Sequence, residues 1–159
     1  MGTTTFTGPV TVGSIIDTSG SVLGNNVQNT GFVELVQKQA ITQAAGGGGG
    51  AGVYVTNIVI PASSTIVAIT LVVSTAWTGV ASPLGIGTTA SATALTTAAA
   101  VAGGTAGYIS VTPGTGATQI GNWVNVGTTD IQIKLTSTNT GSGAGTLIVT
   151  YIQTVNTIS

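Results

Sequence analysis

The sequence predicts an all-β protein, an antiparallel sandwich or barrel, of which we favour the β-sandwich. Its apolar segments are short, rich in Ile, Val and Thr, and separated by clusters of Gly, Ser, Thr and Asn. Several of them alternate apolar with other residues, which is the period of a β-strand with one buried face. No long amphipathic helix stands between them, so helical crossovers between parallel strands are not expected.

The amino-terminal part differs from the rest of the chain. Residues 1–30 scatter their apolar side chains among Gly, Thr and Asn without a sustained period, which predicts an extended N-terminal arm. The sandwich domain is then expected to span residues 31–159 and to begin with a strand at Phe32–Gln43. The glycine-rich segment 44–52, "AAGGGGGAG", is typical of a flexible connector inside this domain.

The next segment, "NIVIPASSTIVAITLVVSTAW" at residues 57–77, contains no charged side chain. A helix that spans a bilayer needs about 20 consecutive apolar residues. Here Pro61 and the small polar residues after it divide the segment into two short apolar runs. We therefore predict no membrane span but two strands, Val53–Ile60 and Ile66–Ser74, joined by a turn.

The remaining strands are predicted from the same alternation of strand and turn residues. The segment 91–107, "SATALTTAAAVAGGTAG", is expected to hold a single helical turn at most, because its threonines and glycines disfavour a long helix. The predicted strands are Leu84–Gly87, Gly107–Thr112, Gln119–Val126, Ile131–Thr138 and Thr146–Thr154.

Two strands are apolar on both faces, because successive side chains of a strand point to opposite sides. Parity places Val67, Ile69, Leu71 and Val73 opposite Ile66, Ala68 and Val72, and it places Leu147, Val149 and Tyr151 opposite Ile148 and Ile152. Only one face of each sheet meets the core of a sandwich, so we expect a neighbouring subunit to cover the second face. The alternative is cover by a long loop of the same chain. The predicted subunit interface consists of Ile66, Val72, Trp77, Ile148 and Ile152, whereas Trp123 is assigned to the core.

Charged side chains are almost missing from this chain of 159 residues, of which they make up 3%. With a net charge of −1 there is little electrostatic repulsion between copies, which favours a homo-oligomer. Two lysines cannot neutralise a run of phosphates or bind an anionic lipid surface, so neither nucleic acid nor membrane is an expected partner. The five charged residues are Asp17, Glu34, Lys38, Asp130 and Lys134.

The sequence offers little catalytic chemistry. It has no His and no Cys, and a Ser or Thr nucleophile needs an activating base. Lys134 and Ser137 would lie on opposite faces of their strand. The spacing of Gly47, Gly49 and Gly52 imitates a dinucleotide fingerprint, but a strand is predicted after it where a helix is required. We predict no enzyme, no cofactor and no metal; the alternative to a structural turn at Asp130 is a calcium site completed by backbone carbonyls.

A resemblance to a known family is carried by two stretches, "SPLGIGTTASATAL" and "QIGNWVNVGTTDIQIKLTSTNTGSGAGTLIVTYIQ". They resemble capsid decoration, or cement, proteins and related head-associated β-sandwich proteins of tailed bacteriophages. The similarity covers most of Thr56–Gln153. More weakly, "TTTFTGPV" resembles the N-terminal arms of phage structural subunits.

The resemblance implies a jelly-roll-like fold and a location in the virion, on the outer capsid surface. It implies a homo-oligomer, with a trimer favoured over a dimer, that binds the major capsid protein and stabilises the head. The arm would make the capsid contact, and the residues that we assign to that contact are Phe6, Pro9, Val10, Ile15 and Ile16.

Two alternatives to the cement function stay open at this stage. The first is a fibre or tail knob that recognises a receptor or a glycan through an exposed aromatic platform, for which Trp77 and the tyrosines are the candidates. The second is a coat subunit itself, although a shell around nucleic acid usually presents more basic groups than two lysines.

Overall fold

The computed structural model describes residues 33–44, 46–79, 83–98, 100–138 and 140–153. The predicted N-terminal arm, with its assigned contact residues Phe6, Pro9, Val10, Ile15 and Ile16, lies outside the described residues.

Eight strands and one short helix make up the described part of the chain. Most strands lie where the alternation of residues predicts them, with ends that differ by one or two residues. The strands are β1 (Val33–Thr42), β2 (Val53–Ile60), β3 (Thr65–Thr75), β4 (Pro83–Thr88), β5 (Val101–Ala102), β6 (Gly107–Val111), β7 (Ile131–Ser137) and β8 (Ala144–Gln153); the helix is α1 (Ala117–Val124).

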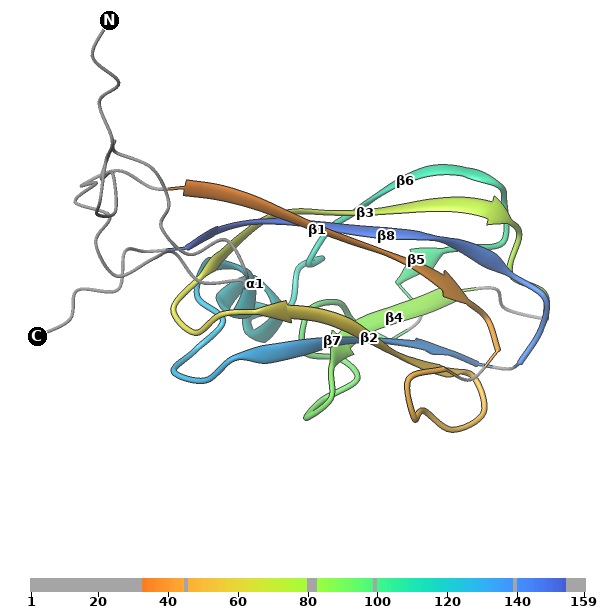
Figure 1. The fold of residues 1–159 in the computed structure, drawn as a ribbon, viewed down its shortest axis with the longest axis horizontal. Coiled ribbons are helices and arrows are strands. Elements are labelled where there is room, and N and C mark those ends of the chain that lie inside the picture. Colours follow the sequence, from red (N-terminus) through yellow and green to blue (C-terminus); the bar gives the residue numbers. More distant parts are fainter. Residues whose placement is uncertain (1–32, 45, 80–82, 99, 139, 154–159) are drawn as a thin grey trace, which may run out of the picture.

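The strands form two four-stranded sheets that pack face to face (Figure 1). One sheet has the order β1-β8-β3-β6 and the other the order β2-β7-β4-β5. The antiparallel partners β1 and β8, β2 and β7, β3 and β6, and β4 and β5 are nested, as in one long hairpin rolled up on itself. This is the strand order of a jelly roll. The predicted all-β antiparallel sandwich is confirmed.

The core lies between the two sheets and is built from alternate residues of each strand. In β8, Leu147, Val149 and Tyr151 are each at most 1% exposed, and they face Ile133 and Leu135 of β7 across the sandwich. Their neighbours in sequence, such as Ile148, point to the outside and are only half-buried. The alternation that predicts a sandwich therefore also assigns the core face of β8 correctly.

Strand β3 departs from simple alternation near its start. The register against β8 shifts between Ile66 and Ala68, so that Val67 is an extra residue in the ladder. Such a bulge reverses the faces of the residues before it relative to those after it. Ile66 is consequently buried with Ile69, whereas Val67 is 46% exposed. The parity prediction that put Val67 on the same face as Ile69, and Ile66 on the opposite face, was wrong.

The predicted strand Gln119–Val126 was also wrong, because α1 occupies most of it. Side chains three and four residues apart share one face of a helix. Gln119, Asn122 and Trp123 have this spacing, and they donate hydrogen bonds to the carbonyl oxygens of Thr93, Ala94 and Leu95, at 2.8, 2.7 and 2.9 Å. Three consecutive backbone acceptors thus hold the helix against the β4–β5 connection.

The segment 91–107, expected to hold one helical turn at most, holds no helix among its described residues. It makes turns and contributes β5, a strand that the sequence did not predict. The buried Thr96 forms hydrogen bonds with both backbone groups of Ile86, because its hydroxyl accepts from the amide at 2.9 Å and its own amide donates to the carbonyl at 2.9 Å. These bonds extend the sheet beyond the short β5 pairing.

Glutamine side chains close the sandwich where β1 and β2 run side by side in different sheets. Gln37 Nε2 donates to the Val59 carbonyl at 2.6 Å, and Gln37 Oε1 accepts from the Val59 amide at 3.2 Å. Gln39 Oε1 accepts from the Asn57 amide at 2.6 Å. The edge of β2 is thereby satisfied by side chains of β1 and not by another strand.

The glycine-rich segment 44–52 joins β1 to β2 through hydrogen-bonded turns. The Gly46 amide donates to the Val53 carbonyl at 3.2 Å, and the Gly46 carbonyl accepts from the Val55 amide at 3.0 Å. Gly47 has a φ of +60°, and a Cβ at this position would collide with the Val55 carbonyl oxygen. Glycine is required there by both backbone conformation and space.

Tyr151 makes the stability of the fold depend on pH in the alkaline range. Its ring is 1% exposed, and burial raises the pKa of its hydroxyl above the usual 10.0, although the hydrogen bond from Gln37 Nε2 at 2.9 Å acts in the opposite direction. Because the folded state disfavours the phenolate, this contribution to stability is complete below pH 10.0 and is lost as the pH rises through the higher folded-state pKa.

We therefore expect the free energy of unfolding to fall above pH 10.0, and Tyr151→Phe to make that fall shallower. The measurement is urea unfolding at a series of alkaline pH values for both proteins. Parallel curves for the two proteins would contradict the assignment of the effect to Tyr151.

Candidate interaction surface

Apolar side chains of several strands gather on the outer face of the β1-β8-β3-β6 sheet. We call this surface the outer face. It is bare of any other element among the described residues. Its side chains are Glu34, Val36, Lys38, Ala40 and Thr42 of β1; Ala144, Thr146, Ile148, Thr150 and Ile152 of β8; Ala68, Thr70 and Val72 of β3; and Tyr108 and Ser110 of β6.

The register of the sheet arranges these side chains in rows across the strands. One row contains Lys38, Ile148, Thr70 and Ser110. A neighbouring row contains Ala40, Thr146, Val72 and Tyr108. Val36 and Tyr108, near opposite edges of the sheet, are 60% and 73% exposed. The outer face thus carries aliphatic side chains and threonines in a continuous pattern, in place of the charged residues usual on a solvated sheet.

The charges on the outer face are confined to one strand. Glu34 and Lys38 both lie on the exposed side of β1, and Val36 lies between them. Neither side chain forms an ion pair within the described residues. The rest of the outer face is uncharged, so another protein can cover it without burying an unpaired charge.

The outside of the β2-β7-β4-β5 sheet has a different character. Gly85 and Gly87 of β4 are buried, and a Cβ on Gly87 would collide with the backbone of Ser91 and Ala92. The β4–β5 connection therefore lies directly on this part of the sheet. Cover by a loop of the same chain, the alternative raised by the sequence, applies to this sheet and not to the described part of the outer face.

The residues predicted for a subunit interface separate into two groups. Val72, Ile148 and Ile152 lie on the outer face and are half-buried. Ile66 and Trp77 are 4% exposed and belong to the core, so they cannot reach a neighbouring subunit. The bulge at Val67 turns Ile66 toward the core and so explains its burial. Trp77 lies after β3, where its ring packs against Gly143, and no sequence pattern distinguishes such an end of the core from an exposed rim.

Among the described residues, the aromatic side chains do not gather into an exposed platform for a glycan. Trp77 and Tyr151 are buried, and Trp123 and Tyr54 are partly buried against the core. Tyr108 is exposed, and its hydroxyl lies 3.2 Å from Thr70 Oγ1 within hydrogen-bond distance. Among the described residues, Tyr108 is the one exposed aromatic side chain, whereas a receptor-binding knob would need an aromatic platform.

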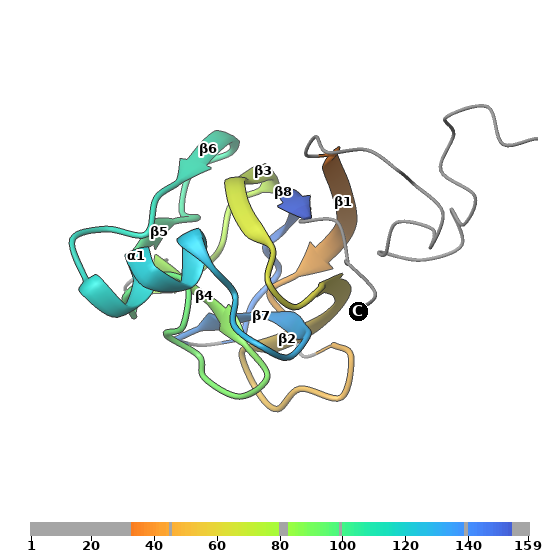
Figure 2. The same ribbon diagram turned by 90° about the vertical axis from the view of Figure 1, so that its left-hand side faces the viewer.

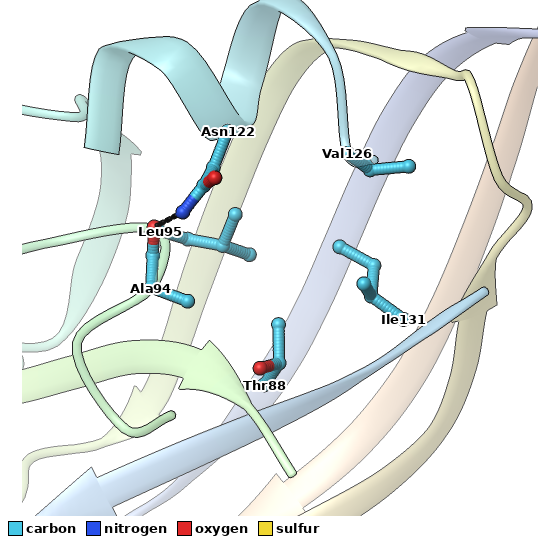
Figure 3. Close-up of a pocket in the computed structure, with 6 residues that line it drawn as sticks. All are labelled: Thr88, Ala94, Leu95, Asn122, Val126 and Ile131. Atoms are coloured by element: carbon cyan, nitrogen blue, oxygen red, sulfur yellow. Dashed lines mark hydrogen bonds between the residues drawn. The ribbon is translucent and has the colours of Figure 1, made fainter. Parts of the chain in front are cut away.

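Helix α1 lies at the side of the sandwich away from β1 (Figure 2). A cavity of about 160 Å³ lies beside α1 (Figure 3). It is lined by Thr88, Ala94, Leu95, Asn122, Val126 and Ile131. Its polar side chains already take part in hydrogen bonds: Asn122 Nδ2 donates to the Ala94 carbonyl at 2.7 Å, and Thr88 Oγ1 accepts from the Ser91 amide at 3.1 Å. None of the described lining residues titrates, so the cavity offers room for a small apolar group but no acid, base or nucleophile.

Ionisable side chains do not gather elsewhere in the described part of the molecule. No group of three or more His, Cys, Asp or Glu residues forms there. Asp130 Oδ1 accepts a hydrogen bond from the Ala62 amide at 2.9 Å, which ties two turns together. The helix of the described part is also too short to cross a membrane.

Comparisons with protein-family models, with curated proteins and with solved structures found no match to this chain.

Proposed function

We propose that the protein is a structural virion protein, a capsid decoration (cement) protein that binds the major capsid protein on the outer surface of a phage head and stabilises it. The observation that carries the proposal is the bare outer face, whose central strands carry aliphatic side chains and threonines and whose two charges lie on one edge strand. Such a face is suited to a permanent protein neighbour. Its two charged side chains are Glu34 and Lys38, and no group of three or more His, Cys, Asp or Glu residues forms among the described residues.

Two further features support this proposal. The jelly roll is an architecture that viral capsid proteins and lectins share, although a fold alone does not define a function. The low charge of the chain reduces repulsion between copies, which matters in an assembly where many copies stand close together. The resemblance of the sequence to phage decoration proteins favours the same class of structural virion protein.

The energetics of such an assembly depend on repetition. Apolar surface contributes about 25 cal/mol per Å² removed from water, and part of this gain is lost to the ordering of the partners. One outer face covered by a neighbour therefore gives a modest contact. The same contact repeated over a shell raises the free energy needed to open the particle.

The proposal predicts that phage particles lacking this protein lose their genome more readily. Particles with and without it are heated or osmotically shocked, and the surviving fraction is compared. We expect lower survival without the protein and recovery of survival when purified protein is added back. Equal survival of both preparations would remove the cement function.

A surface variant links this effect to the outer face. Ile148→Asp places a charge in the centre of the outer face, opposite Lys38, and should change the free energy of unfolding by about 1 kcal/mol or less. Binding to particles should weaken by about tenfold or more, because the new carboxylate would be buried by the partner. Val55→Asp is the matched control: Val55 is also half-buried and lies opposite Lys134, but on the other sheet. Equal weakening by both variants would contradict a role for the outer face.

A further inference from the structure

We propose that β1 is a self-complementary edge through which two copies of this chain pair antiparallel, strand to strand, about a two-fold axis at Val36. This inference deepens the proposed function and rests on it, because it names the partner of one edge of the assembled subunit. It follows from the direction of the β1 backbone groups and from the placement of Glu34 and Lys38.

The backbone groups of β1 that face away from β8 can be identified from the ladder. The Gln43 amide donates to the Gly143 carbonyl at 2.7 Å, and the register from Val33 to Thr42 continues to this pair without a shift. Bonded pairs occur at every second residue of an antiparallel ladder, so the odd-numbered residues of β1 bond to β8. The even-numbered residues, among them Glu34, Val36 and Lys38, direct their amide and carbonyl groups to the free edge.

A second observation agrees with this direction. Tyr54 of β2 donates a hydrogen bond from its hydroxyl to the Ala40 carbonyl at 3.4 Å, from the side opposite β8. Among the described residues, β8 is the strand partner of β1, and no turn or side-chain hydrogen bond reaches the free-edge backbone groups of Glu34, Val36 or Lys38. Figure 2 places β1 at the border of its layer, on the side away from α1 and β6.

The charges on β1 are arranged symmetrically about Val36. Glu34 stands two residues before it and Lys38 two residues after it, and all three side chains are exposed on the outer face. In an antiparallel pair with Val36 opposite Val36 of the second copy, each Glu34 lies directly opposite a Lys38. Opposite charges in this position stabilise a strand pair. The residues that would form these ion pairs are the same ones whose backbone groups face the free edge.

Charges on an edge strand commonly prevent strand pairing. The pattern of the charges distinguishes an edge that prevents pairing from an edge that pairs with its own copy. A defensive edge carries lysines or other like charges, which repel a second copy. The β1 edge carries one charge of each sign at equal distances from a central valine. This arrangement disfavours most strands but matches its own copy. Pairing would also join the two outer faces into one continuous sheet surface, with the ion pairs at its centre.

The test is sedimentation velocity of the full chain over a range of concentrations at low ionic strength. We expect the wild type to form a dimer, in contrast to the trimer that the resemblance favours. Glu34→Lys alone and Lys38→Glu alone place like charges opposite each other, and each should raise the dissociation constant by about tenfold or more. The double variant Glu34→Lys/Lys38→Glu should restore wild-type affinity. An equal mixture of the two single variants should form heterodimers.

Two controls complete the experiment. Lys134→Glu makes the same charge change as Lys38→Glu but on β7, and should leave the dimer unchanged. Val36→Pro removes an amide that faces the free edge and should abolish dimerisation, while circular dichroism verifies that the sandwich is folded.

Three results would overturn the inference: a wild type that is monomeric at all concentrations, a trimer that is insensitive to the single reversals, or a double variant that is no better than the single ones. If the reversals leave self-association unchanged but weaken binding to particles, the edge serves the capsid protein instead of a second copy. The particle-survival experiment is independent of these results, so failure of the dimer and failure of the cement function are distinguishable.

Discussion

Trp77→Ala is expected to lower the free energy of unfolding by about 3–5 kcal/mol, the cost of removing a buried aromatic side chain and leaving a cavity. Trp77 is 4% exposed, and its ring covers Gly143 at the turn before β8. Its amide donates to the Gly103 carbonyl at 2.9 Å, so the residue joins the β3–β4 segment to the end of β5. Thermal and urea unfolding of the isolated protein measure the loss.

Trp77→Phe is the control, because it keeps an aromatic ring in the same place and should cost clearly less. The two assignments of Trp77 predict different outcomes. If Trp77 belongs to the core, its removal destabilises the isolated chain. If Trp77→Ala instead left stability unchanged and reduced only assembly, the interface role that the sequence suggested would be correct and the burial described here would be wrong.

Gln43→Leu is expected to cost about 3 kcal/mol, although it introduces an apolar side chain of similar size into a buried site. Gln43 is 1% exposed. Its Nε2 donates to the Thr78 carbonyl at 2.6 Å, and its Oε1 accepts from the amides of Thr78 and Gly143 at 2.8 and 3.2 Å. Leucine would leave the buried amide of Gly143 and the part-buried amide and carbonyl of Thr78 without that partner. Removing one partner of a buried hydrogen bond costs more than replacing both partners by apolar groups.

Gln39→Leu provides the comparison within the same strand. Gln39 Oε1 accepts from one exposed backbone amide, that of Asn57, and its loss should cost about 1 kcal/mol or less because water replaces the bond. Chemical unfolding of both variants gives the difference. Equal effects would show that Gln43 is not a special contact between the ends of β1, β3 and β8.

The strand pattern of the sequence predicts the fold because burial on one face repeats every two residues. β2 lies where it was predicted, and β7 and β8 differ from prediction by at most two residues at either end. Helix α1 was missed because its apolar residues do not make a buried stripe: Ile120 and Val124 are exposed, and the helix is held by polar side chains that bind the β4–β5 connection. These acceptors are distant in sequence, so no local pattern reveals them.

The candidate surface was predictable only in part. The alternation in β8 correctly placed Ile148 and Ile152 on the outside, because that strand has no bulge. The bulge at Val67 moved Ile66 into the core, and a one-residue insertion in a ladder has no clear signal in a run of apolar residues. The opposed charges of Glu34 and Lys38 became meaningful once β1 was known to be an edge strand.

An electron-microscopy reconstruction of intact particles tests the central claim most directly, which is that the outer face of the β1-β8-β3-β6 sheet is covered by protein in the virion. We expect density for the sandwich on the outside of the shell, with Val72, Ile148 and Ile152 against a neighbouring subunit. A reconstruction in which this sheet faces solvent, or in which the protein is missing from the shell, would contradict the account.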